Sequence, residues 1–283
     1  MAEPVFATKQ MLEQVFDGAA DLYDRAGPSI FRQFAARLVE WMAMEPVLSG
    51  VEGPGARALD VATGKGAVLI PIAQRVGAVV GIDLSSAMLE EAERAARAAG
   101  IANYELRKMD AEHLEFPDAS FDAVTCAFAL FFFPAMEAAL REMHRVCKPG
   151  GRIGISMWGK EPFGLAWKIF AEQVRAYGIE VRNPQRVAYT PEGVHALLAT
   201  AGFIDIETRS ETTDVVYASE EDWWNFQLTL ASRAAIYRMD DATRAQFKQE
   251  YLAKVRPFFQ ADGLHLPAPV IYAVANRQSS VDR

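Results

Sequence analysis

The chain has 283 residues, of which 51% are hydrophobic and 23% are charged, so it can bury a sizeable core and is not disordered. Its net charge is −8, and no lysine- and arginine-rich run stands anywhere in the sequence. A protein that binds DNA or RNA would need such a run for its phosphate contacts. We therefore expect a small-molecule substrate and no nucleic acid as partner.

The two cysteines, Cys126 and Cys147, have neither the number nor the spacing of a disulfide framework or a zinc site, so no metal is expected. The N-terminus lacks a basic start followed by an apolar stretch, and the longest apolar run, 123–135, is too short to span a bilayer. The sequence predicts a cytoplasmic protein with no membrane partner, present as a monomer or a homodimer.

The first part of the chain has the apolar spacing of helices, over residues 8–46, with a break at Gly27-Pro28. A linker rich in glycine and proline follows at 48–55. From Arg57 onward, short apolar runs alternate with helical patterns, which is typical of a parallel sheet with crossover helices. The predicted strands are 58–62, 79–83, 104–109, 123–128, 152–158, 204–217 and 264–275. The predicted helices between them are 67–76, 85–99, 134–147 and one that Thr190 caps and Gly202 ends.

The segment between the last two predicted strands, 219–262, reads as helical and is rich in aromatic residues. The pattern as a whole predicts an α/β fold with a Rossmann-like sheet, mostly parallel, whose last strand is antiparallel. We expect a helical cap over 1–50, a core made of 51–218 and 263–283, and a helical lid insert over 219–262.

A nucleoside ligand on an open parallel sheet binds beyond the carboxyl ends of the strands. The first strand carries Asp60 near its end, and the small residues Ala62, Gly64 and Gly66 follow, which allow a ligand to approach the backbone closely.

Two other Gly-rich loops are poor matches to this segment. A phosphate-binding P-loop would need a glycine at the position of Leu59 and a serine or threonine directly after Lys65. A dinucleotide-binding loop would need a third small residue at the position of Leu69.

The next two strands also end in acidic residues. Asp83 is placed to accept hydrogen bonds from both hydroxyls of a ribose. Asp110 could accept a hydrogen bond from the exocyclic amine of adenine, while the backbone N–H of Ala111 meets a ring nitrogen. Three acidic strand ends, counting Asp60, fit an uncharged adenosine that carries a cationic sulfonium better than a ligand rich in phosphates.

Five segments follow one another along the chain: LDVATGKG at 59–66, VGIDLSSAM at 80–88, MDAE at 109–112, FPDASFD at 116–122 and LREMHRVCKPGG at 140–151. In this order they resemble the successive motifs of the class I S-adenosylmethionine-dependent methyltransferases. The branch that the chain resembles holds ubiquinone/menaquinone C-methyltransferases and natural-product enzymes similar to aklanonic acid methyltransferase. The resemblance covers residues 10–160 well and the later part only loosely.

The resemblance also implies a role for each position that matches the family's motifs. The loop 60–66 would face the methionine portion of the cofactor, and Asp83 would bind the ribose. The residues expected around the adenine and the methyl group are Leu84, Met88, Asp110, Ala111, Ala127 and Phe128. Tyr23 resembles a family tyrosine that closes over the cofactor, with plain helix packing as its alternative. The family's usual first glycine is Ala62 here, which slightly narrows the space beside the cofactor.

Methyl transfer depends chiefly on positioning, and a general base is needed only when the nucleophile must lose a proton. The only histidine that we consider as a base is His265, which starts the last strand beside the insert. The aromatic insert favours an apolar or aromatic substrate, although simple packing onto the sheet is an alternative. We expect the substrate pocket to include Phe132, Trp223, Trp224 and Arg233, with Arg233 either pairing with an acidic group of the substrate or lying on the surface.

The resemblance implies an S-adenosylmethionine-dependent methyltransferase that methylates O, N or C of a small metabolite and releases S-adenosylhomocysteine. The alternative is a protein that keeps this fold and binds the cofactor but acts as a cyclase or as a non-methylating binding module. The intact set of cofactor residues favours the first interpretation.

Overall fold

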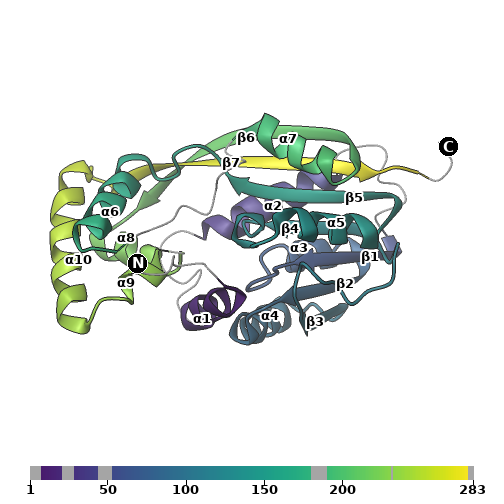
Figure 1. Ribbon diagram of the computed structural model, residues 1–283, viewed down its shortest axis with the longest axis horizontal. Helices are drawn as coiled ribbons and strands as arrows, with labels where there is room; N and C mark the ends of the chain where they lie inside the picture. The colour runs from purple at the N-terminus through teal and green to yellow at the C-terminus, as the bar shows by residue number, and fades with distance from the viewer. Residues whose placement is uncertain (1–7, 21–28, 44–52, 180–189, 231, 280–283) are drawn as a thin grey trace.

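The computed structural model describes residues 8–20, 29–43, 53–179, 190–230 and 232–279 (Figure 1). Within these ranges the chain forms one seven-stranded sheet in the order β3-β2-β1-β4-β5-β7-β6. The strands are β1 (Gly53–Val61), β2 (Val76–Asp83), β3 (Tyr104–Lys108), β4 (Phe121–Ala127), β5 (Cys147–Trp158), β6 (Phe203–Tyr217) and β7 (Leu264–Arg277).

The sheet confirms the predicted fold class. β1 to β5 pair in parallel, and β7 is antiparallel to both of its neighbours, β5 and β6. β1 lies between β2 and β4, so the order of the parallel strands reverses on its two sides. Such a reversal opens a crevice beyond the carboxyl ends of the strands, where ligands of α/β sheets bind.

Helices cover both the sheet and its carboxyl end. They are α1 (Lys9–Ala19), α2 (Ile30–Ala43), α3 (Leu69–Ala73), α4 (Ser86–Ala98), α5 (Met136–Val146), α6 (Gly164–Ala176), α7 (Pro191–Thr200), α8 (Glu220–Gln227), α9 (Arg233–Ile236) and α10 (Asp241–Val255), with 3-10 turns η2 (Leu130–Phe132) and η3 (Arg256–Phe258). Two predicted caps are confirmed: the Ser85 hydroxyl accepts from the Met88 N–H, and the Thr190 hydroxyl accepts from the Gly193 N–H.

Several element boundaries differ from the predictions. The helix predicted over 67–76 is reduced to α3, because residues 64–68 form turns and Val76 already belongs to β2. The predicted turn at 148–151 lies inside β5, where the pairing with β4 shifts register. Helix α6 is absent from the predicted elements.

The segment between β6 and β7 is helical, as predicted, and consists of α8, α9, α10 and η3. These helices and α6 gather at the end of the molecule toward which β5 points (Figure 1). The division of the chain into a cap, a core and an insert remains a prediction. Among the helices that the structure describes, none is long and apolar enough to cross a membrane.

Candidate functional site

The loop after β1 turns back over the end of β2. Ala62, Gly64 and Gly66 all have positive φ angles, of 54°, 52° and 80°. The Thr63 N–H donates to the Ile82 carbonyl at 2.8 Å, which ties the loop to β2. A Cβ atom built on Gly64 would meet no heavy atom within 4 Å, so the space beside this backbone is open to a ligand.

Asp83 holds this loop and still has capacity to accept hydrogen bonds. Its carboxylate accepts from the backbone N–H groups of Gly64 and Ser85, each at 2.9 Å. An ionised carboxylate offers about four lone-pair sites, so acceptor capacity remains for hydroxyl groups of a ligand. Burial raises the pKa of Asp83, and the hydrogen bonds from these N–H groups oppose the shift.

Asp60 is more deeply buried than Asp83 and is engaged by two hydroxyl groups. Its carboxylate oxygens accept from the Thr63 hydroxyl at 2.6 Å and from the Thr125 hydroxyl at 2.8 Å. Burial raises the pKa of Asp60 to about 6, although both hydroxyl groups act in the opposite direction. Asp60 therefore shapes the loop from below and borders the cavity on the α2 side of it.

A cavity with mainly apolar walls lies above Asp83. The wall on the sheet side includes Ile82, Leu84, Met88 and Met109, and the wall on the α1 side includes Leu12 and Phe16. Its polar lining groups include Asp83, Asp110 and Glu112, and Ala127, Phe128 and Phe132 also line it. An apolar slot lined by carboxylates at separate points has the chemistry that a nucleoside requires.

A second cavity shares Ala62, Gly64, Ala127 and Phe128 with the first. It extends between the loop and α2, where Phe31 and Arg32 line it. The described residues that we predicted to hold the cofactor therefore line two adjoining cavities, and Gly66 and Asp60 face the second of them. Tyr23 lies outside the described residues.

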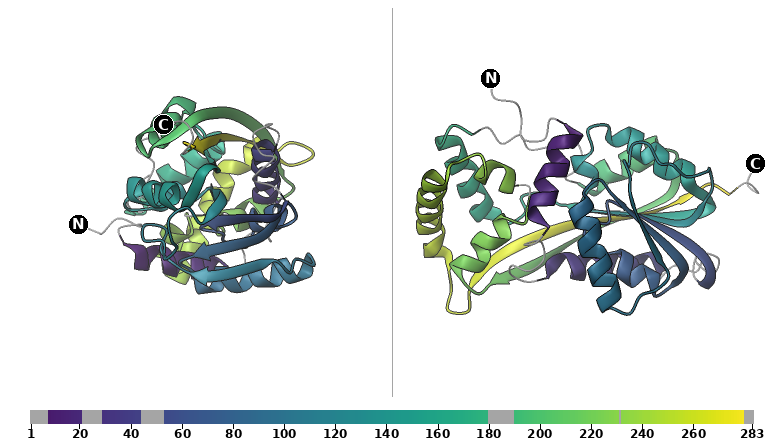
Figure 2. Two further views of the ribbon diagram at one scale, coloured as in Figure 1. Left: turned by 90° about the vertical axis from the view of Figure 1, so that its right-hand side faces the viewer. Right: turned by 90° about the horizontal axis from the view of Figure 1, so that it is seen from below.

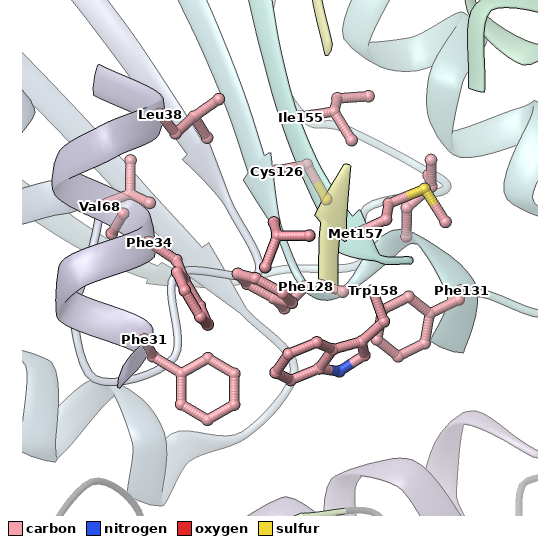
Figure 3. Packing of buried hydrophobic residues seen from close by; sticks show 14 of the residues in the cluster. Phe31, Phe34, Leu38, Val68, Cys126, Phe128, Phe131, Ile155, Met157 and Trp158 are labelled. Atoms are coloured by element: carbon pink, nitrogen blue, oxygen red, sulfur yellow. The ribbon is translucent and has the colours of Figure 1, made fainter. Parts of the chain in front are cut away.

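Phe128, which lines both cavities, packs at a junction of aromatic side chains that includes Phe31 and Trp158 (Figure 3). The ring of Phe128 lies 4.7 Å from that of Trp158 at the end of β5, and 5.4 Å from that of Phe31, between ring centroids. Phe226 of α8 stacks on Phe31, with 6.4 Å between the ring centroids. The end of β4 is therefore connected to the insert through packed aromatic rings.

Lys9 and Glu112, which line the first cavity beside Asp110, were not predicted as site residues from the sequence. Lys9 of α1 places its ammonium 2.6 Å from Asp110 and 2.5 Å from Glu112. Burial raises the pKa of Asp110, but the hydrogen bonds from Lys9 and from the Glu112 N–H outweigh it, and the net shift is downward. The sequence signal that could have indicated this contact is the helical spacing of residues 9, 12, 13 and 16, which places them on one face of α1.

The two tryptophans predicted to line the substrate pocket are buried in the helical segment 219–262 and border neither of the two cavities. Trp223 is fully buried, and its indole N–H donates to the Tyr251 hydroxyl at 2.8 Å. Trp224 is 4% exposed and packs near Phe247, with the Lys248 ammonium 5.6 Å from its ring centroid. Their rings pack α8 against α10. An indole buries a large apolar area, so this packing stabilises the contact between the two helices.

The other two substrate-pocket candidates occupy different places. Phe132 lines the first cavity, where its ring centroid lies 5.3 Å from that of Phe16. Arg233 lies between α9 and α1: its guanidinium carbon is 4.1 Å from the ring centroid of Tyr237, and its Nη2 is next to Gly18.

The position of His265 does not favour a role as general base. Its Nδ1 lies 2.6 Å from Asp214 and its Nε2 lies 3.0 Å from Asp262. The hydrogen bonds to these two carboxylates raise the pKa of His265. Both ring nitrogens are thus engaged on the β6–β7 hairpin, and His265 does not border either of the two cavities described above.

Comparisons with solved structures agree with this architecture. The [4+2]-cyclase SpnF has a TM-score of 0.59 and 22% identity, over 99% of this chain and 100% of that one. The phosphoethanolamine N-methyltransferase 2 of Haemonchus contortus, solved with S-adenosylhomocysteine, has a TM-score of 0.55 and 20% identity, over 93% of this chain and 58% of that one. Identities this low establish the fold alone.

Sequence comparison goes further. Residues 58–151 match the family described as "Methyltransferase domain". Nocamycin O-methyltransferase of Saccharothrix syringae is 34% identical over 67% of this chain and 65% of its own length. Aklanonic acid methyltransferase DauC of a Streptomyces species is 38% identical over 52% of this chain and, again, 65% of its own length. The matches therefore span somewhat less than two thirds of these two relatives.

A third relative is matched along nearly its whole length. The demethylmenaquinone methyltransferase of Geobacillus stearothermophilus is 31% identical over 73% of this chain and 94% of its own length. The motifs at the ends of β1, β2 and β3 lie within the matched family region, and Asp83 and Asp110 line the first cavity. The chain therefore belongs to the class I S-adenosylmethionine-dependent methyltransferases.

Proposed function

We propose that this chain binds S-adenosylmethionine and transfers its methyl group to O, N or C of a small apolar or aromatic molecule. The observation that carries the proposal is Asp83, whose carboxylate retains acceptor capacity beneath an apolar slot at the reversal point of the sheet. When bound, the cofactor supplies an electrophilic methyl group on a positively charged sulfur.

The residues of the site divide the work of binding and orientation. Asp83 accepts from the ribose hydroxyls, and Leu84 and Met88 pack on the adenine. Asp110 and the Ala111 N–H meet the edge of the ring. The loop 60–66 and Ala127–Phe128 border the methionine portion, and the apolar walls exclude water from the slot. Positioning of the acceptor then provides much of the rate.

The aromatic junction of Phe31, Phe128 and Trp158 supports an acceptor that is itself apolar or aromatic. The named relatives act on small molecules, nocamycin, aklanonic acid and demethylmenaquinone, which is consistent with this class of acceptor. Phe132 forms part of the cavity wall on this side.

We also propose that Arg233, which borders neither of the two cavities in this structure, pairs with an acidic group on the acceptor. Its Nη1 is buried and has no hydrogen-bond partner among the residues that the structure describes. A buried guanidinium nitrogen is stabilised by an anionic oxygen, which a carboxylate on the acceptor would supply.

The test is to incubate the protein with labelled S-adenosylmethionine and a panel of phenols, quinols, carboxylic acids and amines, and to measure S-adenosylhomocysteine. We expect product with at least one aromatic acceptor, and faster product formation when that acceptor carries a carboxylate. In Arg233→Gln the preference for the carboxylate should disappear while cofactor affinity stays the same.

The second candidate function is a cyclase or a non-methylating binding module, which the fold shared with the [4+2]-cyclase SpnF favours. Tight binding of S-adenosylmethionine without product from any acceptor would support it. Absence of binding, with no change on Asp83→Ala, would contradict both candidates.

A further inference from the structure

Helix α1 forms one wall of the proposed adenine slot. Its residues Lys9, Leu12, Glu13 and Phe16 line the cavity opposite Leu84, and Figure 2 shows the helix alongside α4. A ligand between α1 and the end of β2 is therefore covered by this helix. Displacement of α1 would open this side of the slot.

Few apolar side chains hold α1 in place. Leu12 and Ala19 are its buried residues, and Ala19 packs with Ala20 and Met88 in a cluster separate from the main core. The partly buried Phe16 packs against this cluster and contacts the ring of Phe132 edge to face. An element with so little buried apolar surface opens at a low free-energy cost. The position of α1 must then depend strongly on its polar contacts.

These polar contacts lie at several points along α1. Near its C-terminal end, the Asp17 carboxylate accepts from the Ser85 hydroxyl at 2.6 Å and from the Ala87 N–H at 3.3 Å. In its middle, Glu13 pairs with Lys108 at 2.5 Å on the exposed side. At its first residue, Lys9 bridges Asp110 and Glu112. Of these contacts, only the ion pairs of Lys9 involve Asp110, the carboxylate proposed to accept a hydrogen bond from adenine.

The charges around Lys9 are concentrated on partly buried carboxylates. The Glu112 side chain is 7% exposed, and its other oxygen accepts from the Ala135 N–H at 2.8 Å. Asp110 also accepts from the Glu112 N–H at 2.9 Å and lies 3.4 Å from His113. Two neighbouring carboxylates in such a place repel each other, and Lys9 supplies the compensating charge.

We propose that Lys9 is a positioning residue whose ion pairs with Asp110 and Glu112 form a latch that holds α1 over the adenine. Asp110 then accepts hydrogen bonds from both Lys9 and the adenine. This inference rests on the proposed function. The exocyclic amine of adenine is a neutral donor, so it cannot replace the charge of Lys9, and Asp110 can accept from both groups. Bound adenine displaces water from the slot, which strengthens the ion pair. Cofactor binding and closure of α1 therefore reinforce each other.

The test compares Lys9→Met, which removes only the charge, with Lys9→Arg, which restores it. Lys168→Met is the matched control, because Lys168 forms a 3.1 Å ion pair with Glu161, well exposed and outside both cavities. We expect S-adenosylhomocysteine to dissociate about fivefold faster from Lys9→Met, with wild-type rates in the control. Added salt should speed dissociation from the wild type and have little effect on Lys9→Met.

Hydrogen exchange in the protein without cofactor gives a second readout. The amides of α1 should exchange faster in Lys9→Met than in the control, and Lys9→Arg should restore the slower exchange. Equal exchange and equal dissociation in Lys9→Met and the control would overturn the latch. If no variant, nor the wild type, binds S-adenosylhomocysteine, the proposed function fails and the role of Lys9 at adenine fails with it, even when exchange in α1 responds.

Discussion

The ends of the parallel strands and the helical insert both carry many candidate residues, but the structure uses them differently. Asp60, Asp83 and Asp110 end up around one loop and its adjoining cavities. Trp223 and Trp224, which are equally prominent in the sequence, pack among the aromatic side chains of α8 and α10. Residues at strand ends are placed by the sheet itself, whereas the direction of a helical side chain depends on where its helix docks.

The difference also appears in the chemistry of the groups. The carboxylates at the strand ends lie where backbone N–H groups and hydroxyls hold them, and Asp83 retains acceptor capacity. In the insert, the polar atom of Trp223 is already satisfied by Tyr251, which in turn donates to the Ala166 carbonyl at 3.1 Å. A ring whose polar atom is internally satisfied is typical of a structural core.

The largest expected effect is on stability. Trp223→Ala should lower the free energy of unfolding by about 3–5 kcal/mol, because it empties a fully buried site. Trp223→Phe, which loses the hydrogen bond to Tyr251 but keeps a ring, is the matched variant and should lose much less. Denaturant unfolding measures both. If Trp223→Ala changed the KM for the acceptor and left the free energy of unfolding unaltered, Trp223 would lie at the substrate. The contrast between the strand ends and the helical insert would then be wrong.

Asp83→Ala should weaken the binding of S-adenosylhomocysteine at least about 100-fold, since two hydrogen bonds to a charged acceptor are lost. Calorimetry measures the affinity, and the melting temperature shows how far the loss of the Gly64 and Ser85 contacts disturbs the fold. Asp83→Asn keeps one carbonyl acceptor and should lose less. Wild-type affinity in Asp83→Ala would contradict the assignment of the ribose site.

The buried Asp60 predicts a pH dependence of stability. Because its pKa in the folded protein is raised to about 6 from 3.8, the folded state retains a proton that the unfolded state has lost between these values. The contribution of Asp60 to the free energy of unfolding therefore falls as pH rises from about 4 to about 6, by about 3 kcal/mol at most. In Asp60→Asn this contribution should vanish. Parallel pH profiles for the two proteins, measured by denaturant unfolding, would show that Asp60 titrates normally.

The smallest expected effect is on turnover. His265→Gln should leave kcat unchanged within about twofold, because both nitrogens of His265 are engaged by Asp214 and Asp262 away from the cavities. The pKa of His265 is raised in the folded protein, so its ion pairs stabilise the fold at low pH and are lost as pH rises through that pKa. A pH-rate profile with an acidic limb that disappears in His265→Gln would instead identify a general base.

Much of the parallel sheet could be predicted from local patterns. The end of β2 at Asp83 follows from a short apolar run, and the helix after Ser85 follows from its cap. The boundaries of α3 could not be predicted, because the apolar residues at 67–76 suit a helix until the chain must enter β2. Helix α6 was missed, and its role in packing depends on contacts with α10 that are remote in sequence.

The sequence by itself predicted the fold class and the order of the acidic strand ends, because parallel-strand topology brings those ends to one edge whatever the loops do. The cofactor class followed from the resemblance of five segments to the motifs of a known family. The tertiary structure alone decided which aromatic residues face the cavities, that His265 is paired at the β6–β7 hairpin, and that Lys9 reaches Asp110. These are contacts between segments far apart in the chain. They depend on how the helices dock against the sheet and against each other, and the spacing of residues within one segment does not determine this docking.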